Sequence, residues 1–258
     1  MSAPFDLTGK SILVAGGAGY LGLPGCLLMA RLGAKVAIAD IDPVRLEKAV
    51  AAVREAGGEA LGLPLDFADE DSILGCVRAA VEQMDGLHGV VNATFGSTGK
   101  RFDDLTVADF DRTNRLNLTS TFVLAREAAR HMEAGGSLVM FASMYGVVAP
   151  NPANYPAPMA PNPIEYGAGK AGIIQMVRYM AGHFGRRGIR VNAVAPGPYP
   201  HQATQESAEF MGNLSRSTML GRIGRQDEMA GPTVFLLSDA ASYITGQCLN
   251  VDGGWTAW

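Results

Sequence analysis

The segment from Ser11 to Gly22 reads Ser-Ile-Leu-Val-Ala-Gly-Gly-Ala-Gly-Tyr-Leu-Gly, and it decides the fold. Its first five residues, Ser11–Ala15, form an apolar run with the length of a buried strand. The glycines that follow allow a tight turn, and an amphipathic stretch then runs to about residue 32. A strand that turns sharply into a helix brings the positive helix N-terminus to the turn, where a pyrophosphate can bind. The segment therefore predicts a dinucleotide site.

The next predicted strand ends in an acid that can select the cofactor. Asp40 stands 24 residues after Gly16. A carboxylate at this point can accept hydrogen bonds from the adenosine ribose of NAD and would repel the 2′-phosphate of NADP. No Arg or Lys follows Asp40 until Arg45, so the sequence favours NAD, with NADP as the less favoured cofactor. Asp42 competes for the same role, and a solvent-facing loop acid is the alternative interpretation of Asp40.

Short apolar runs alternate with longer amphipathic ones along the whole chain. The predicted strands are Ser11–Ala15, Lys35–Ala39, Ala60–Leu65, His88–Asn92, Ser137–Ala142, Ile189–Val194 and Gln247–Val251. The predicted helices lie near 20–32, 43–56, 69–84, 106–132, 165–186 and 226–238. Several strands are apolar throughout, as in a parallel sheet covered on both faces. This pattern predicts an α/β fold: a single doubly wound, Rossmann-like domain over 1–258 with a seven-stranded parallel sheet flanked by helices.

Two segments break the alternation, and both follow the carboxyl ends of predicted strands, where ligands bind in such sheets. Pro150–Pro163 holds six of the 14 prolines and is expected to be a loop. The second segment, from Pro196 to about Leu220, is irregular or weakly helical. We expect substrate-loop segments at about 144–164 and 198–220 to wall a substrate pocket. Their polar, aromatic and cationic side chains are candidates for substrate contacts or for ordinary loop packing: Asn151, Asn154, Asn162, His201, Gln202, Tyr145, Tyr155, Arg216 and Arg222.

Tyr166 and Lys170 lie four residues apart in a predicted helix, so their side chains share one face. No other of the seven tyrosines has a lysine at this spacing. A phenol, with a reference pKa of about 10, is a poor base at neutral pH. A fixed cation nearby lowers that pKa toward the working range. The pair is a candidate acid–base site, although a coincidental spacing is the alternative.

The net charge and the composition disfavour several classes of binding partner. A net charge of −4 and a pI near 5.6 argue against nucleic acid or an anionic membrane as a partner. Three scattered cysteines suit buried thiols in a reducing cytoplasm, and four scattered histidines lack metal-ligand spacing, so we expect no metal. The uncharged run Ser11–Ala30 could span a bilayer by length, but five glycines and a proline interrupt it. We expect a cytoplasmic protein with a small-molecule substrate.

Several motifs follow one another in a characteristic order. The glycine turn is followed by Asn92-Ala93 after the fourth strand, by Ser143 after the fifth and by Pro196-Gly197 after the sixth. The chain ends with Val251-Asp252-Gly253-Gly254. In their order and spacing these residues resemble the short-chain dehydrogenase/reductase family, in its single-domain form, over essentially the whole chain.

The resemblance implies roles for individual residues. The catalytic set would be Asn117, Ser143, Tyr166 and Lys170. The cofactor-binding set would be Gly16, Gly19, Tyr20, Leu21, Gly22, Asp40, Asp66, Phe67, Asn92, Ala93, Tyr166, Lys170, Pro196 and Gly197. Ser143 would hold the substrate oxygen, Tyr166 would exchange its proton, and Asn117 would hold a relay water. Lys170 would bind the nicotinamide ribose and lower the Tyr166 pKa.

The sequence also departs from the family pattern. Its G-x-x-G-x-x-G spacing is that of the extended branch, and Ala15 replaces a threonine that usually braces the turn. The threonine expected after Pro196-Gly197 is absent, and Pro198 and Tyr199 stand there. The long loop before Tyr166 is similar to that of oxidoreductases from bacterial sugar and nonulosonate pathways and of gluconate-type dehydrogenases.

The resemblance implies an NAD-dependent oxidoreductase that interconverts a secondary alcohol and a ketone on a small polar, sugar-like substrate. A sugar epimerase or dehydratase that uses NAD without net turnover is one alternative. A non-catalytic nucleotide-binding protein on the same fold is the other. The resemblance also implies a homotetramer or homodimer. Trp255 and Trp258 near the C-terminus are expected to be buried against a neighbouring subunit or over a pocket.

Overall fold

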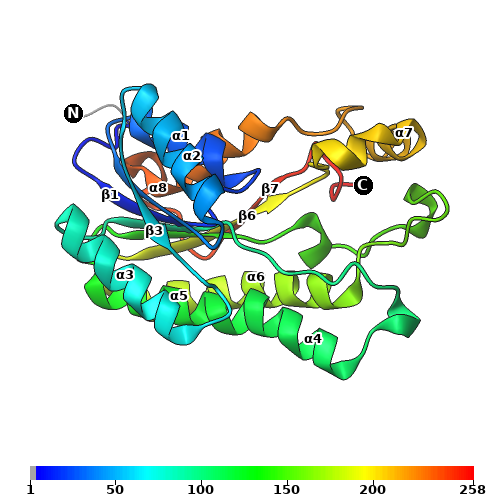
Figure 1. Cartoon of the computed structure of the whole chain (residues 1–258), viewed down its shortest axis with the longest axis horizontal. Coiled ribbons are helices and arrows are strands. Elements are labelled where there is room, and N and C mark those ends of the chain that lie inside the picture. The colour runs from blue at the N-terminus through cyan, green and yellow to red at the C-terminus, as the bar shows by residue number, and fades with distance from the viewer. Residues whose placement is uncertain (1–3) are drawn as a thin grey trace.

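The computed structural model describes residues 4–258, apart from the side chain of Ala203. Its centre is a seven-stranded sheet in the order β3-β2-β1-β4-β5-β6-β7, with every neighbouring pair parallel (Figure 1). The strands are β1 Ser11–Ala15, β2 Lys35–Asp40, β3 Glu59–Pro64, β4 Gly89–Asn92, β5 Ser137–Phe141, β6 Arg190–Pro196 and β7 Cys248–Val251. The predicted doubly wound α/β fold is confirmed.

Helices cover both faces of the sheet. The helices are α1 Gly22–Arg31, α2 Pro43–Glu55, α3 Glu70–Met84, α4 Val107–Asn114, α5 Ser120–His131, α6 Ile164–Phe184, α7 Ala208–Arg216 and α8 Ala230–Leu237. One face carries α1, α2 and α8, and the other carries α3, α4, α5 and α6 (Figure 1). None of the helices in residues 4–258 combines the length and apolar character needed to cross a membrane.

The core forms two layers, one on each side of the sheet. Side chains alternate across a strand, so Leu13 belongs to the layer under α3, α5 and α6, whereas Ile12 and Val14 belong to the layer under α1, α2 and α8. All three are almost fully buried. Burying one such side chain stabilises the fold by roughly 1.5–3 kcal/mol. The two layers hold the carboxyl ends of the strands in fixed positions, and the site lies there.

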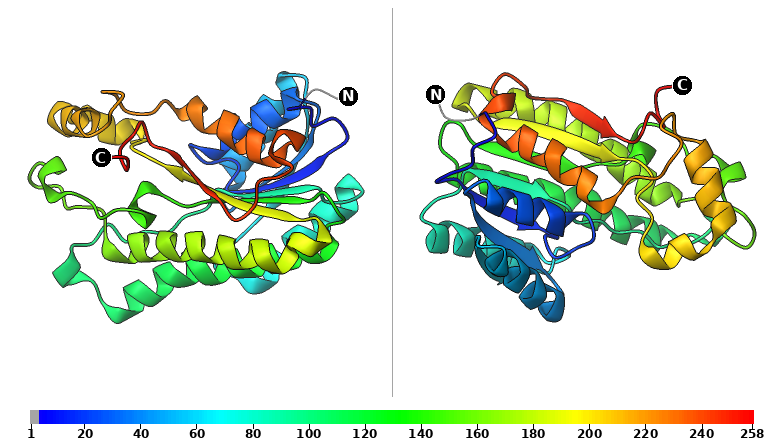
Figure 2. Two further views of the ribbon diagram at one scale, coloured as in Figure 1. Left: turned by 180° about the vertical axis from the view of Figure 1, so that it is seen from behind. Right: turned by 90° about the horizontal axis from the view of Figure 1, so that it is seen from above.

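The structure differs from the predicted elements in two places. The predicted helix 106–132 is split into α4 and α5 by a π-helical segment, Arg115–Thr119. The segment expected to be irregular or weakly helical contains a regular helix, α7, which Ser207 caps by accepting a hydrogen bond from the Phe210 amide. Phe210 and Leu214 form the buried face of α7. The C-terminus and α7 lie near each other beyond the same end of the sheet (Figure 2).

Candidate active site

The glycine turn after β1 is tight and leaves a helix N-terminus open. Gly16 has a φ of +72°, and a Cβ on Gly22 would lie 2.4 Å from the Gly16 carbonyl oxygen. The amides of Gly16 and Gly17 both donate to the carbonyl oxygen of Ala39, which braces the turn from β2 without a threonine at position 15. The first turn of α1 has no acidic residue and no side-chain cap. The turn therefore fits a pyrophosphate, which the helix N-terminus would bind.

Asp40 ends β2 with a buried carboxylate. Its oxygen accepts hydrogen bonds from the Asp42 amide and from the Arg45 guanidinium, both at 3.1 Å. Asp42 instead caps α2 by accepting from the amides of Val44 and Arg45. Because the side chain of Asp42 is used in the cap, Asp40 is the acid placed to meet a ribose. Arg45 lies between the two carboxylates, 3.1 Å from Asp40 and 3.2 Å from Asp42.

A cavity of about 170 Å³ opens where β1, β4, β5 and β6 end. It brings together ten of the predicted site residues: Gly19, Tyr20, Leu21, Gly22, Ala93, Ser143, Tyr166, Lys170, Pro196 and Gly197. Five further residues that sequence reasoning missed complete its lining: Thr94, Phe95, Phe141, Ala142 and Tyr199. Tyr199 occupies the region where the family threonine is absent. Of the five residues, only Thr94 could have been inferred from a motif, because it directly follows Asn92-Ala93.

The other predicted residues lie around this cavity. The Asn92 amide group donates to the Thr121 hydroxyl and accepts from the Thr94 amide, so it braces the chain after β4. The Asp66 carboxylate is exposed and accepts from the amide of Ala68. The side chain of Phe67 is buried in the core layer. The side chains of Asn92 and Phe67 therefore have structural partners in the protein.

Lys170 is a buried cation at the base of the cavity. Its side chain is 1% exposed, and Nζ donates to the carbonyl oxygen of Phe141 at 2.7 Å and approaches that of Thr94 at 3.4 Å. Nζ also lies 5.7 Å from the centroid of the Tyr166 ring. Burial lowers the pKa of Lys170 to about 7. The two side chains share one helix face, as predicted from the spacing.

The Tyr166 hydroxyl shows the opposite of the predicted shift. Burial raises the pKa of Tyr166, and the hydrogen bond with the Ser143 hydroxyl lowers it by a smaller amount. Lys170 does not reverse this shift, because its ammonium is directed at backbone carbonyls. In the protein alone the Tyr166 pKa is therefore raised, because desolvation of the phenol is the larger effect, and the lowering of this pKa by Lys170 stays a prediction.

Asn117 lies in the π-helical segment and clamps the chain that follows β4. Its side chain accepts from the Gly96 amide and donates to the Gly96 carbonyl, each at 2.9 Å. Its own carbonyl accepts from the Thr121 hydroxyl. A second clamp comes from the fully buried Glu165, whose carboxylate accepts from both the amide and the hydroxyl of Thr98. The two clamps fix the 93–98 stretch beside Tyr166.

A second cavity, of about 220 Å³, adjoins the first. The two share Ser143, Tyr166 and Gly197. The remaining lining comes from both predicted loop segments: Met144, Tyr145, Tyr155, Asn162, Pro198, Pro200, Thr204, Phe210 and Leu214. Ser143 and Tyr166 are thus accessible from both cavities, as a proton-transfer pair between cofactor and substrate needs to be.

Most of the other polar candidates in the loops are bound within the protein. Arg222 makes two hydrogen bonds to Glu228, and Arg216 makes one to Asn213. The His201 ring packs on Tyr20, with centroids 4.8 Å apart, and so joins the second loop segment to the glycine turn. Asn151 caps a short turn and Asn154 accepts from Ser217. Gln202 is exposed. Asn162 is the predicted amide that reaches the second cavity.

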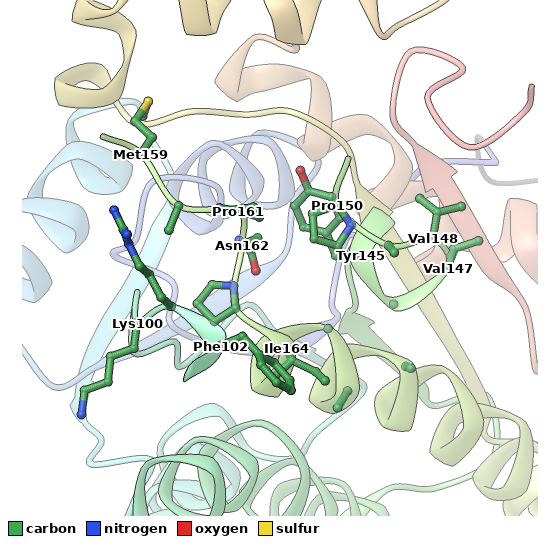
Figure 3. Close-up of a pocket in the computed structure, with 18 residues that line it drawn as sticks. Lys100, Phe102, Tyr145, Val147, Val148, Pro150, Met159, Pro161, Asn162 and Ile164 are labelled. Carbon is green, nitrogen blue, oxygen red and sulfur yellow. The ribbon is translucent and has the colours of Figure 1, made fainter. Parts of the chain in front are cut away.

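A third and larger cavity, of about 770 Å³, lies on the outer side of the first loop segment (Figure 3). Tyr145 and Asn162 line both this cavity and the one at Tyr166. In Figure 3 they lie between Val148 on one side and Met159 on the other. They therefore form the wall that separates the outer cavity from the catalytic residues.

Comparison with known proteins agrees with this geometry. A family model described as enoyl-(acyl carrier protein) reductase matches residues 21–256. The 2,5-dichloro-2,5-cyclohexadiene-1,4-diol dehydrogenase of Sphingobium indicum is 34% identical, over 98% of this chain and 99% of its own. The cyclopentanol dehydrogenase of a Comamonas species is 33% identical, over 96% and 97%.

A solved structure has the same fold and matches this chain over almost its whole length. A short-chain dehydrogenase/reductase from Serratia marcescens is 32% identical and has a TM-score of 0.88, covering 98% of this chain and 100% of that one. The family model and the relatives together span almost the whole chain. The chain belongs to the short-chain dehydrogenase/reductase family, which includes dehydrogenases that act on CH–OH groups and in which NAD(P) dependence is typical.

Proposed function

We propose that the protein interconverts a secondary alcohol and its ketone on a small ring substrate, with NAD as the cofactor. The observation that carries this proposal is the meeting of two cavities at Ser143 and Tyr166. The first cavity adjoins the glycine turn and fits a nicotinamide. The second is lined by both apolar and polar side chains and fits a small substrate.

Each residue of the site would have a separate role in the reaction. A bound nicotinamide supplies the hydride acceptor and, when oxidised, a positive charge. Ser143 Oγ accepts a hydrogen bond from the Tyr145 amide, and its own proton, which is directed at Tyr166 in the protein alone, would bind the substrate oxygen when substrate is present. Tyr166 then takes the carbinol proton, or returns it in the reverse reaction. The buried ammonium of Lys170 and the cofactor charge both favour the phenolate that this step needs.

Proton release requires a route away from Tyr166. The side chain of Asn117 is fully engaged with Gly96. A relay water would therefore be held by the main-chain carbonyl of Asn117, at the π-helical segment, rather than by its amide group.

The lining of the second cavity supports a ring alcohol. Met144, Pro198, Pro200, Phe210 and Leu214 offer no hydrogen bonds from their side chains. Two relatives are named for action on carbocyclic alcohols. A sugar-like substrate remains a prediction. NAD rather than NADP is proposed because the buried Asp40 carboxylate would meet the ribose.

The test is turnover by the wild type and the Tyr166→Phe variant with cyclic alcohols, sugars and aldonates, followed by NADH absorbance. We expect the variant to lose about 10²–10⁴-fold in kcat/KM while its affinity for NADH, measured by fluorescence, stays unchanged. Tyr179→Phe is the matched control, because Tyr179 lies on the same helix but is exposed. Retained turnover in Tyr166→Phe would refute the acid–base role. Failure of the wild type to accumulate NADH with any alcohol would favour an epimerase.

A further inference from the structure

The substrate cavity contains two phenols besides Tyr166. The hydroxyl oxygens of Tyr145 and Tyr155 lie 2.5 Å apart, and we call these two residues the phenol pair. Tyr145 follows Ser143 by two positions on a short 3₁₀ turn, and Tyr155 comes from the proline-rich loop. Both residues line the cavity that Ser143 and Tyr166 also line. The pair is therefore placed to touch whatever substrate reaches the catalytic hydroxyls.

The phenol pair is held in place by its surroundings. The Tyr155 ring packs on Phe210, with centroids 5.4 Å apart. The backbone N–H of Asn162 lies near the Tyr155 hydroxyl and offsets part of the rise in the Tyr155 pKa. The Tyr145 amide is bound to Ser143 Oγ at 3.1 Å. Contacts from the 3₁₀ turn, the proline-rich loop and α7 thus fix the pair.

Both members of the pair stay protonated at working pH. Burial raises the pKa of Tyr145, and the neighbouring phenols Tyr155 and Tyr166 raise it further. Burial also raises the pKa of Tyr155. The pair therefore carries two hydroxyl protons under the conditions in which the enzyme would act.

One of the two hydroxyl protons of the phenol pair has no acceptor among the residues that the structure describes. One of the two protons lies between the two oxygens, which are 2.5 Å apart. Within residues 4–258, neither hydroxyl makes a hydrogen bond to another side chain. The second proton therefore has no protein acceptor and is available in the cavity. Because the two residues are half-buried and line the cavity, an acceptor on a bound ligand would be favoured there.

We propose that the phenol pair binds a second oxygen of the substrate, so that the enzyme prefers small cyclic diols and hydroxyketones to ring alcohols with one oxygen. The reacting oxygen would lie on Ser143 and Tyr166, and the second oxygen would accept the free proton of the pair. This inference rests on the proposed function and names its substrate class. Tyr145 and Tyr155 are then specificity-determining residues.

Turnover of matched substrates tests the preference. We expect the wild type to oxidise the best of the cyclohexanediol isomers with a kcat/KM about tenfold above that for cyclohexanol, the size expected for one hydrogen bond to a buried donor. The double variant Tyr145→Phe/Tyr155→Phe, which has no hydroxyl at this place, should bring this ratio close to one, whereas each single variant keeps one phenol proton for the substrate and should keep part of the preference. Tyr243→Phe, at a fully exposed tyrosine, is the control and should keep the wild-type ratio. An unchanged ratio in the double variant overturns the proposal.

Binding without turnover separates this proposal from the proposed function. Tyr166→Phe loaded with NAD is titrated with 4-hydroxycyclohexanone and with cyclohexanone by calorimetry. Tighter binding of the hydroxyketone, abolished when Tyr145→Phe and Tyr155→Phe are both added, supports the proposal even if the wild type turns over neither ring. Equal affinity for the two ketones refutes the phenol pair as a recognition element while leaving alcohol oxidation intact as a function.

Discussion

Single residues at this site combine burial with charge in ways that stability measurements can detect. Lys170 is the largest fully buried side chain, and its ammonium has two backbone carbonyls as partners. Burial lowers the pKa of Lys170 to about 7. The fold therefore disfavours the positive charge that the proposed chemistry requires. Such a cost is expected where a group serves chemistry rather than folding.

The pH dependence of unfolding should reveal the buried amine. Between the native pKa of about 7 and an unfolded value of about 10.4, the unfolded chain holds a proton that the native protein has lost. The wild-type free energy of unfolding should therefore rise with pH by about 1.4 kcal/mol per unit in this window, relative to Lys170→Met. Urea unfolding from pH 7.5 to 9.5 measures the difference. Lys48→Met, at an exposed lysine, should show the same pH dependence of the unfolding free energy as the wild type. The same pH dependence in Lys170→Met would contradict the burial effect.

The glycine turn gives a second prediction at the residue scale. Gly22→Ala places a Cβ 2.4 Å from the Gly16 carbonyl oxygen, and neither backbone can move away cheaply. We expect a loss of about 1–3 kcal/mol in unfolding free energy from this overpacking, and a weaker affinity for NADH. Gly75→Ala is the matched control, because its Cβ would enter open space on α3. That variant should gain about 0.5–1 kcal/mol and keep its NADH affinity. Similar behaviour of the two variants would argue against a close-packed turn.

Secondary-structure elements differ in how far the sequence predicts them. Residues Ser11–Ala15 are predicted as a strand with the bounds that the structure shows, because a continuous apolar run is bounded by a glycine turn. The π-helical segment Arg115–Thr119 was not predicted, because its apolar pattern continues that of the flanking helices. The pattern of α7 was weak, since only Phe210 and Leu214 are buried on it. Local patterns therefore predict elements that fill the core, but not the irregular ones that shape the site.

The turn between β2 and α2 should control cofactor choice. Replacing Asp40 by Ser removes the carboxylate that would bind the ribose and frees Arg45 from one of its two acidic partners. Hydrogen bonds to charged groups contribute about 1.5–3 kcal/mol, so the NAD:NADP ratio of kcat/KM should fall by at least about tenfold. Asp42→Ala is the control: loss of the α2 cap should cost about 1 kcal/mol of stability with little change in the ratio. An unchanged ratio in Asp40→Ser would remove the basis for assigning NAD.

At the scale of the whole molecule, the site depends on contacts between segments that are distant in sequence. The catalytic residues were predicted because each belongs to a motif of fixed spacing. The Tyr145–Tyr155 hydroxyl contact, the packing of His201 on Tyr20 and the Glu165–Thr98 clamp have no such spacing. They arise because parallel strands bring their carboxyl ends to one edge, where loops from different parts of the chain meet. The sequence shows that the loops lie at this edge, but not which side chains meet there.

The C-terminus closes the substrate side of the molecule, and its two tryptophans should behave differently. Trp255 is 8% exposed and packs with Met144, Phe210 and Leu214, which line the substrate cavity, whereas Trp258 is 76% exposed. Trp255→Ala should lower the free energy of unfolding by about 3 kcal/mol and raise the alcohol KM, with NADH affinity unchanged. Trp258→Ala should change stability by less than about 0.5 kcal/mol.

Of the two tryptophans, Trp258 has the surface available to a neighbouring subunit, so a weakened association in sedimentation should come from Trp258→Ala alone. Equal effects of both variants on KM would show that the terminus does not support the cavity through Trp255.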